Sequence, residues 1–237
     1  MTWWNGSDGD DMTDFLDRLA EPAEDLLSKV DAVLVRVGAP ADHPLVPLLR
    51  HLGALPGEAV AAVTTLGVQP LSATGPALRN ISHSYARVRV TAPDWHGRAA
   101  DAFTNHLTAL SAHVEHNLSG RLAGTACFAD AVADWAGRTR RAVAGTLATV
   151  LASAEAVTVV CGAEPDQLAR AAADIAARVL GTVADAYAEG EALLVAWSGK
   201  LDELAHPSLA WLETTGSITR CFDSGGAGRP GQLDVGL

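Results

Sequence analysis

The sequence predicts an all-α protein, an elongated helical bundle with a disordered C-terminal tail, and two observations predict it. First, apolar residues make up 49% of the 237 residues but aromatic residues only 5%, so Ala, Val and Leu carry most of the apolar surface. Ala has the highest helix propensity, and small side chains let helices approach closely. Second, continuous β-branched runs bounded by turns are nearly absent, which leaves little from which strands could form.

The first helix is expected over residues 12–37, where apolar side chains recur at steps of three, four and seven. Pro22 interrupts this pattern, so a kink or a break is expected there, because proline removes a backbone hydrogen bond. Gly38 is expected to end the helix. Between residues 39 and 72, prolines separate short apolar segments such as Leu45 to Leu52 and Glu58 to Leu66, and this pattern predicts short helices joined by turns.

A second long helix is expected to begin at Thr74 to Pro76, because Thr can cap a helix and Pro suits its first turn. After a turn, nearly all of residues 97–160 can be helical, with Ser119-Gly120 as the weakest point. A last long helix is expected from about Glu164 to Leu204. Residues 214–237 are mostly Gly and polar, and they have too little apolar surface to offset the entropy of ordering, which predicts a flexible tail.

The charge distribution excludes one class of partner. A net charge of −11 argues against nucleic acid, because phosphate binding requires clustered Lys and Arg. Residues 1–31 carry nine acidic and two basic side chains, whereas residues 79–141 carry eight Arg and five acidic side chains. The middle of the chain is therefore expected either to pair with an acidic flank, its own or a partner's, or to form a solvated surface.

No catalytic or metal-binding motif stands out in the sequence. It contains no GxSxG elbow, Walker loop, HExxH or GxGxxG, and its three cysteines imply neither a disulfide framework nor a zinc site. His106, His113 and His116 lie on adjacent turns, and we interpret them as solvated or partner-facing rather than as metal ligands. We therefore expect no enzyme activity, no metal and no cofactor.

The expected turn at residues 93–97 contains a Trp-x-Gly sequence and lies between two predicted amphipathic helices. Amphipathic helices flank Pro93-Asp94-Trp95-His96-Gly97, and small residues and Phe103 follow it. Trp95 can cover the open end of a hairpin core, and Gly97 lets the second helix start without a Cβ clash. Trp135 and Trp197 also precede a glycine by two positions but lie in no such turn, so we interpret them as core or interface anchors on continuous helices.

This pattern resembles the helical hairpin of the WxG family of type VII (ESX) secretion proteins, and the resemblance covers about residues 74–118. It implies an enlarged member, an export substrate or partner-binding component that acts by helix packing. The implied partners are another WxG-type protein or a second copy, and the secretion ATPase. Expected domains are an acidic helical region over 1–72, the WxG-type bundle over 73–213 and the tail. The apolar stripe that would form the packing seam comprises Phe103, Leu107, Leu110 and Val114.

In that family, export is linked to a Tyr-x-x-x-Asp/Glu signal that follows a helical hairpin. Tyr187 and Glu191 match it and lie one turn apart on one helix face; an ordinary interfacial Tyr with a solvated Glu is the alternative. The N-terminus lacks the basic and apolar regions of a secretory signal. We therefore expect synthesis in the cytoplasm and export to the cell surface or medium without a Sec signal. The Arg-rich, Lys-poor composition suits a high-GC bacterium such as an actinobacterium.

Other functions stay open. A membrane-active or pore-forming effector would insert residues 142–161, although Glu155 and several hydroxyls lower the hydropathy of this stretch, and a buried bundle helix explains it equally. A cytosolic helical chaperone or adaptor would form a stable complex without export. A third alternative is a targeting domain of a larger toxin, for which we expect the Gly-rich end to leave no room.

Overall fold

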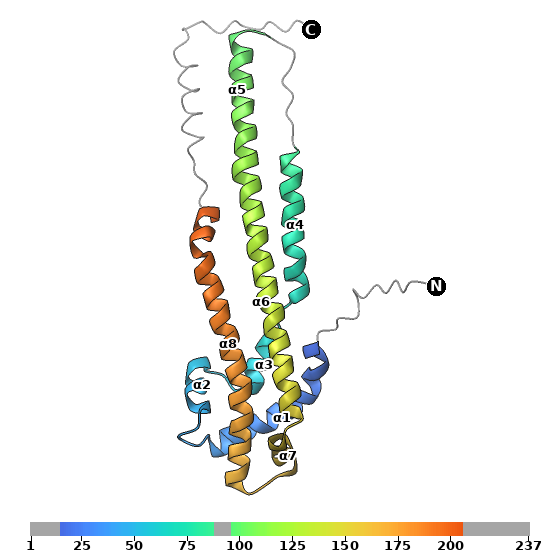
Figure 1. Ribbon diagram of the computed structural model, residues 1–237, viewed down its shortest axis with the longest axis vertical. Coiled ribbons are helices and arrows are strands. Elements are labelled where there is room, and N and C mark those ends of the chain that lie inside the picture. The colour runs from blue at the N-terminus through green and yellow to red at the C-terminus, as the bar shows by residue number, and fades with distance from the viewer. Residues whose placement is uncertain (1–14, 88–95, 206–237) are drawn as a thin grey trace, which may run out of the picture. The chain divides into compact units, whose positions relative to one another are not determined.

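Residues 15–87 and 96–205 are described by the computed structural model of the protein, and every regular element among them is a helix (Figure 1). No strand occurs in these two ranges, which confirms the predicted all-α helical bundle. Trp95 and residues 214–237 lie outside the described residues. The elements are α1 (Phe15–Val37), α2 (Leu45–Leu52), α3 (Pro56–Thr64), α4 (Val68–Ala86), α5 (Arg98–His113), the π-helical segment η1 (Val114–Ser119), α6 (Gly120–Leu151), α7 (Ala154–Cys161) and α8 (Pro165–Ala205).

Several helices begin and end close to where the sequence predicts. The ends of α2 and α8 lie within one residue of their expected positions. α1 ends as expected, because Gly38 has a φ of 83° and its N–H donates to the carbonyl of Leu34 at 2.9 Å. Gly adopts this left-handed conformation without a Cβ penalty. α1 continues through Pro22 as one helix, so the break that this proline made possible does not occur.

The start predicted for the second long helix at Thr74 is wrong. α4 begins at Val68, and the Thr74 hydroxyl donates to the carbonyl of Pro70 at 2.8 Å within the helix instead of capping its end. Pro76 is likewise an internal residue of α4. Thr-Gly-Pro is typical of a helix start, but here the residues that precede it, from Val68 onward, are already helical.

A close contact with α6 accounts for the glycine at position 75 of α4. A Cβ added at Gly75 would overlap the carboxylate of Asp130 and would lie 3.3 Å from the carbonyl oxygen of Ala126. Glycine therefore permits an approach of two helix backbones that any other residue would oppose. Such tertiary packing overrides local helix propensity, and nothing in the sequence near residue 75 announces it.

The chain divides into two compact units. Unit 1 comprises residues 1–77 and 125–199, and unit 2 comprises residues 78–124 and 200–237. The boundaries expected at residues 72 and 213 differ from this division, because the N-terminal helices share one hydrophobic core with α6, α7 and α8. The largest fully buried side chains of that core include Leu16, Leu27, Leu45, Leu147, Ile175 and Leu180.

Within unit 1, α6 and α8 pack side by side in opposite directions (Figure 1). The hydroxyls of Thr146 and Thr182 lie 2.8 Å apart near one end of this contact. Near the other end, the rings of Phe128 and Trp197 have centroids 5.5 Å apart at an angle of 58°. The pairing therefore extends over about five helical turns of α6, which makes it the main scaffold of unit 1.

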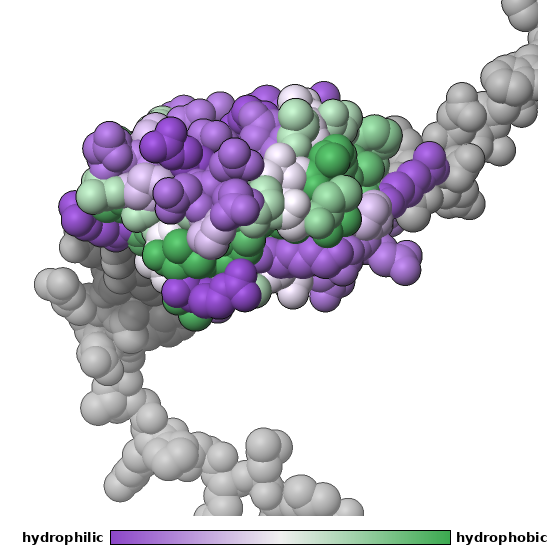
Figure 2. Space-filling model, turned by 90° about the horizontal axis from the view of Figure 1, so that it is seen from below, coloured by the Kyte–Doolittle hydropathy of each residue, from purple (hydrophilic) through white to green (hydrophobic). Residues whose placement is uncertain are grey.

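The apolar stretch over residues 142–161 is divided between α6 and α7. The Ser153 hydroxyl caps α7 by accepting a hydrogen bond from the N–H of Ala156 at 3.2 Å. No single helix in the described ranges is long and apolar enough to cross a membrane, although Arg98–Leu151 and Ala154–Cys161 meet the criteria together as a bent pair. From the end that holds α7, hydrophilic areas interrupt the hydrophobic ones (Figure 2). Residues of the stretch that are buried in the core are Val143, Ala144, Leu147, Val150, Ala156 and Val159.

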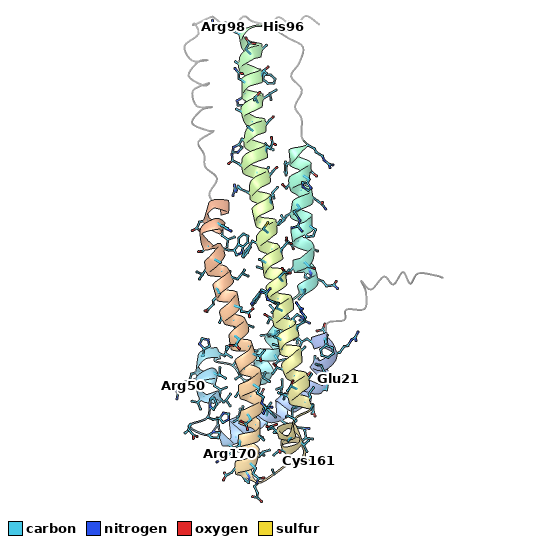
Figure 3. The ribbon with its side chains drawn as sticks, viewed as in Figure 1. Glu21, Arg50, His96, Arg98, Cys161 and Arg170 are labelled. Carbon is cyan, nitrogen blue, oxygen red and sulfur yellow. The ribbon has the colours of Figure 1, made fainter. Side chains whose placement is uncertain are left out.

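Glu155 ties α7 to α8. Its carboxylate accepts a hydrogen bond from Arg178 at 2.9 Å. Hydrogen bonds from its own backbone N–H and from the Ser153 hydroxyl, with a smaller contribution from Arg178, lower the pKa of Glu155 below its usual 4.5. α7 ends at Cys161 (labelled in Figure 3), which is an exposed thiol, as is Cys127.

Asp31 connects α1 to the first turn of α3. Its Oδ2 accepts a hydrogen bond from the N–H of Gly57 at 3.1 Å, which satisfies a donor that the helix itself leaves unpaired. Its Oδ1 is buried and has no hydrogen-bond partner in the described ranges. Burial raises the pKa of Asp31 above its usual 3.8, against the Gly57 hydrogen bond, which lowers it.

Substituting Asp31→Asn should change how stability depends on pH. Because the pKa of Asp31 is raised in the folded state, the folded protein takes up this proton at a higher pH than the unfolded chain does. The free energy of unfolding of the wild type, relative to that of the variant, should therefore increase as the pH falls from 7 towards 4. The difference should level off once the pH is below the pKa of Asp31 in the unfolded chain. Urea denaturation at a series of pH values measures this, and parallel curves for the two proteins would contradict it.

Candidate functional site

The helix after the Trp-x-Gly sequence begins at its glycine. Gly97 precedes α5 with a φ of 114°, and its carbonyl accepts the first helical hydrogen bond, from the N–H of Asp101 at 3.0 Å. A Cβ at Gly97 would meet no described atom within 4 Å. The expected role of this glycine in avoiding a Cβ clash stays a prediction, because residues 88–95 lie outside the described residues, and its positive φ favours glycine independently. His96 and Arg98 lie beside it at this end of α5 (Figure 3).

The helices on either side of residues 88–95 lie against each other within unit 2. The Ser82 hydroxyl of α4 donates to the carbonyl of Ser119 at 3.0 Å, and the Ser119 hydroxyl donates to the carbonyl of Ser82 at 3.4 Å. Both serines are buried. A pair of small side chains that each bond to the other's backbone requires the two helix backbones to be close.

The register of this contact differs from that of a tight hairpin. A sharp bend centred on Trp95 would place Ser82 opposite residues near Thr108, because the two arms would be equally long. Ser119 lies about three helical turns farther along. Within unit 2, α5 therefore continues past the end of α4 (Figure 1).

The predicted seam lies on this extending part of the helical run. Phe103 is 38% exposed, while Leu107, Leu110 and Val114 are half-buried. In the register set by Ser82 and Ser119, all four residues fall beyond the last residue of α4. The packing of the seam against other helices thus stays a prediction. In this register α4 comes near the seam only at its Val114 end.

Of the three histidines of this region, the side chain of His116 lies outside the described residues. Nδ1 of His113 accepts a hydrogen bond from the side-chain amide of Asn117 at 2.8 Å. Among the described residues, no group of three or more His, Cys, Asp or Glu side chains is arranged to hold a metal ion.

Tyr187 and Glu191 lie on α8, on either side of a contact with α6. Tyr187 is 50% exposed and Glu191 is exposed. Between them, Gly190 faces Trp135, and a Cβ there would lie 3.0 Å from the indole ring. The Trp135 indole N–H donates to the carbonyl of Ala186 at 2.9 Å, which confirms Trp135 as an anchor on a continuous helix. Packing thus accounts for the glycine of the Tyr187–Glu191 segment, and both ends of the segment remain accessible.

A small hollow of about 60 Å³ opens beside Tyr187 in unit 1. Its walls come from the end of α3, from α6 and from α8. None of its lining side chains is charged, and Thr139 is buried in its wall with a hydroxyl that has no hydrogen-bond partner in the described ranges. The lining residues are Ala62, Val63, Leu66, Trp135, Thr139, Val183, Ala186 and Tyr187.

Arg140 holds one wall of this hollow in place. Its guanidinium is nearly completely buried and donates to the carbonyls of Val63, Thr64 and Leu66, at 3.2, 2.7 and 3.2 Å. These carbonyls lie at and after the end of α3, where a helix leaves its last carbonyls without intrahelical partners, and that of Val63 also accepts from the N–H of Leu66 at 3.1 Å. The same guanidinium donates to the Asp17 carboxylate of α1 at 2.6 Å. One pair between the basic middle and the acidic N-terminal region therefore forms, as the charge distribution suggested.

A His–Asp pair elsewhere in unit 1 serves as a structural link. Nε2 of His43 lies 3.1 Å from a carboxylate oxygen of Asp174, and Nδ1 accepts a hydrogen bond from the N–H of Leu45 at 3.2 Å. This arrangement places the ring proton on Nε2 and occupies both nitrogens. The pair therefore joins the start of α2 to α8.

Sequence reasoning missed the buried arginine and the hollow. A signal for Arg140 was present, because it falls one turn after Ala136 and two turns before Leu147, within the apolar stripe of α6. A charged residue on an inward stripe indicates a buried partner. The hollow had no such signal, since its walls come from three separate parts of the chain.

The comparisons with known proteins add no family. No protein-family model, curated protein or solved structure matches this chain.

Proposed function

We propose that this chain is a substrate or partner-binding component of a type VII (ESX-like) secretion system and acts by helix packing. The observation that carries the proposal is the arrangement around the Trp-x-Gly sequence. A glycine with positive φ starts the second helix at Gly97, and the helical run that follows returns to contact the first helix at Ser82 and Ser119. This arrangement supports a pair of contacting helices, as the resemblance to WxG proteins implies, with a register offset by about three helical turns from that of a tight hairpin.

The seam on α5 is the surface that we propose binds a partner helix. Phe103 and the half-buried Leu107, Leu110 and Val114 lie beyond the end of α4 in the observed register. Apolar residues at helical spacing are the usual means by which one helix receives another. The partner would be another WxG-type helical protein or a second copy of this chain.

The accessible Tyr187 and Glu191 support a role in export. The two residues lie on one face of α8, one turn apart, and the contact with Trp135 fixes the turn between them. Because Tyr187 is half exposed and Glu191 is exposed, both side chains are accessible to a partner, as an export signal would require.

Export should depend on Tyr187 and on the secretion ATPase. In a bacterium that carries an ESX system, the protein should appear in the culture filtrate, and it should remain in the lysate when the ATPase is inactivated. Tyr187→Ala should have the same effect as loss of the ATPase. The chain offers a matched control in Tyr85→Ala, because Tyr85 is the other tyrosine and is similarly exposed, and this variant should be exported normally. Equal export of both variants would remove Tyr187 from the proposal, and export without an active ATPase would remove the secretion system.

A membrane-active effector is the second candidate, because Arg98–Leu151 and Ala154–Cys161 meet the length and composition criteria for a bent membrane-spanning pair. Against it stands the use of this stretch in the core, where Val143, Leu147 and Val150 are fully buried. Insertion would therefore require unit 1 to open. Flotation of the purified chain with liposomes distinguishes this function from the first.

A further inference from the structure

The end of α8 lies level with η1, next to the seam. Gly190 of α8 faces Trp135 of α6, and one step farther along, Trp197 of α8 contacts Phe128 of α6. Each of these steps is seven residues, forward along α8 and backward along α6, as in an antiparallel pair. Carried on in the same register, Ala205 at the end of α8 falls opposite the residue that follows η1. The last turn of α8 accordingly belongs to unit 2, together with the seam.

The chain can change direction at the level of η1. Pro207 follows the last turn of α8, and a proline cannot continue the backbone hydrogen bonds of a helix. Because η1 rotates less per residue than an α-helix, the seam lies about a quarter turn away from the line of Trp135 and Phe128. A straight continuation of α8 would therefore pass beside the seam, whereas a chain that turns at Pro207 can cross to it.

Residues 206–213 have the composition and the reach to cover the near end of the seam. They lie outside the described residues, and their large apolar members are Leu209, Trp211 and Leu212. Trp211 follows the end of α8 by six residues, and Val114 precedes the end of η1 by about the same number, or about 9 Å along the axis. Six residues span about 9 Å as a helix and up to about 20 Å when extended. Trp211 therefore reaches Val114 in either conformation.

We propose that residues 206–213 of the same chain cover the Val114 end of the seam, with the indole of Trp211 packed on Leu110 and Val114. A tryptophan ring buries a large apolar area in one contact, and the half-buried seam side chains supply a matching surface. Attachment to α8 keeps this segment at a high effective concentration, so it occupies the seam ahead of a second copy or another protein.

The contact itself does not depend on secretion. Its consequence is that a partner helix must displace residues 206–213 before it occupies the whole seam, and this consequence rests on the function proposed above. The Phe103 end of the seam lies about three helical turns from Val114, beyond the reach of Trp211 in a helical segment. A partner would therefore make its first contact at the Phe103 end.

Methyl NMR of the full chain tests the contact without any partner present. The ring current of Trp211 should displace the methyl resonances of Leu110 and Val114, so Trp211→Ala should shift both. The methyl resonances of Leu147, which is fully buried in the core of unit 1, should stay unchanged. Trp4→Ala is the matched control, because Trp4 also lies outside the described residues but near the other end of the chain, and it should shift none of the three.

The other possible occupants give different results. Unchanged resonances of Leu110 and Val114 overturn the proposal, and this is the result expected if residues 88–95, a partner protein or solvent alone covers that end of the seam. A displacement that depends on protein concentration overturns it too, because it places Trp211 on the seam of a second copy.

A second variant separates the contact from a general loss of structure. Trp211→Phe keeps an aromatic ring, so it should retain part of the displacement at Leu110 and Val114. Shifts that extend to Leu147 in both variants would show a global change and would also overturn the proposal. None of these measurements involves export, so a failure here is distinct from a failure of the secretion assay.

Discussion

Replacing Arg140 with alanine should destabilise unit 1 by about 3 kcal/mol, because several charge-assisted hydrogen bonds are lost together. The guanidinium serves three carbonyls at the end of α3 and a carboxylate of α1. Without it, those carbonyls would lose a charge-assisted donor at the edge of a core. Urea denaturation gives the free energy of unfolding, and amide exchange should show that α3 opens first.

Two companion variants of this site separate geometry from charge. Arg140→Lys keeps the charge but has no planar fork, so it should recover only part of the loss. Asp17→Asn should cost less than Arg140→Ala, because asparagine keeps an oxygen that can accept from the guanidinium and leaves the three carbonyl contacts in place. If Arg140→Ala were no more destabilising than Asp17→Asn, the carbonyl contacts would contribute nothing measurable.

Replacing Trp135 with alanine should cost about 3 kcal/mol, through lost packing against α8 and the lost hydrogen bond to Ala186. Trp135→Phe should cost about 1 kcal/mol, because the ring contact remains and the hydrogen bond does not. Thermal or urea denaturation measures both values. Similar losses for the two variants would mean that the hydrogen bond, and not the ring, is the larger contribution.

The glycine opposite Trp135 provides a sharper test of the same contact. In the wild type, Gly190→Ala should be destabilising, since the new Cβ would lie 3.0 Å from a ring that packing holds in place. In the Trp135→Ala background the same change should be stabilising by up to about 1 kcal/mol, because alanine has the higher helix propensity and the ring is absent. An unchanged sign in the two backgrounds would show that the ring does not restrict this position.

Where the sequence carried local signals, the structure follows them closely. α2 and α8 are bounded by proline, glycine and periodic apolar residues, and their ends agree with prediction within one residue. Gly38 ends α1 because a left-handed residue is needed there, which is a property of one position. Trp135 was predicted as an anchor because it interrupts no helix and has no turn nearby.

Where long-range contacts decide, the sequence offered little. The start of α4 was placed six residues too late, and the approach of Gly75 to α6 involves a partner about 50 residues away, so it gives no local signal. The pairing of Ser82 with Ser119 could not be predicted from the sequence either, because nothing in the local sequence distinguishes these serines from ordinary surface residues. The division into two units arises from the same cause, because it is set by which helices share a core. Of the candidate site, the accessible Tyr187 and Glu191 were found, and the hollow beside them was not.

The π-helical segment η1 has a consequence for how the residues before it are oriented. Each residue of an α-helix advances the side chain by about 100°, and a π-helix fits more residues into each turn. Over the six residues of η1, the total rotation about the helix axis is smaller than in an α-helix of the same length by roughly the rotation of one residue. A helical wheel drawn through α5 and Ser119 as one α-helix is therefore out of phase by about a quarter turn. This difference in rotation sets the direction in which the seam side chains from Phe103 to Val114 face around the helix axis, relative to the contact of Ser119 with Ser82. Deleting one residue from η1 would therefore turn the seam toward a different neighbour.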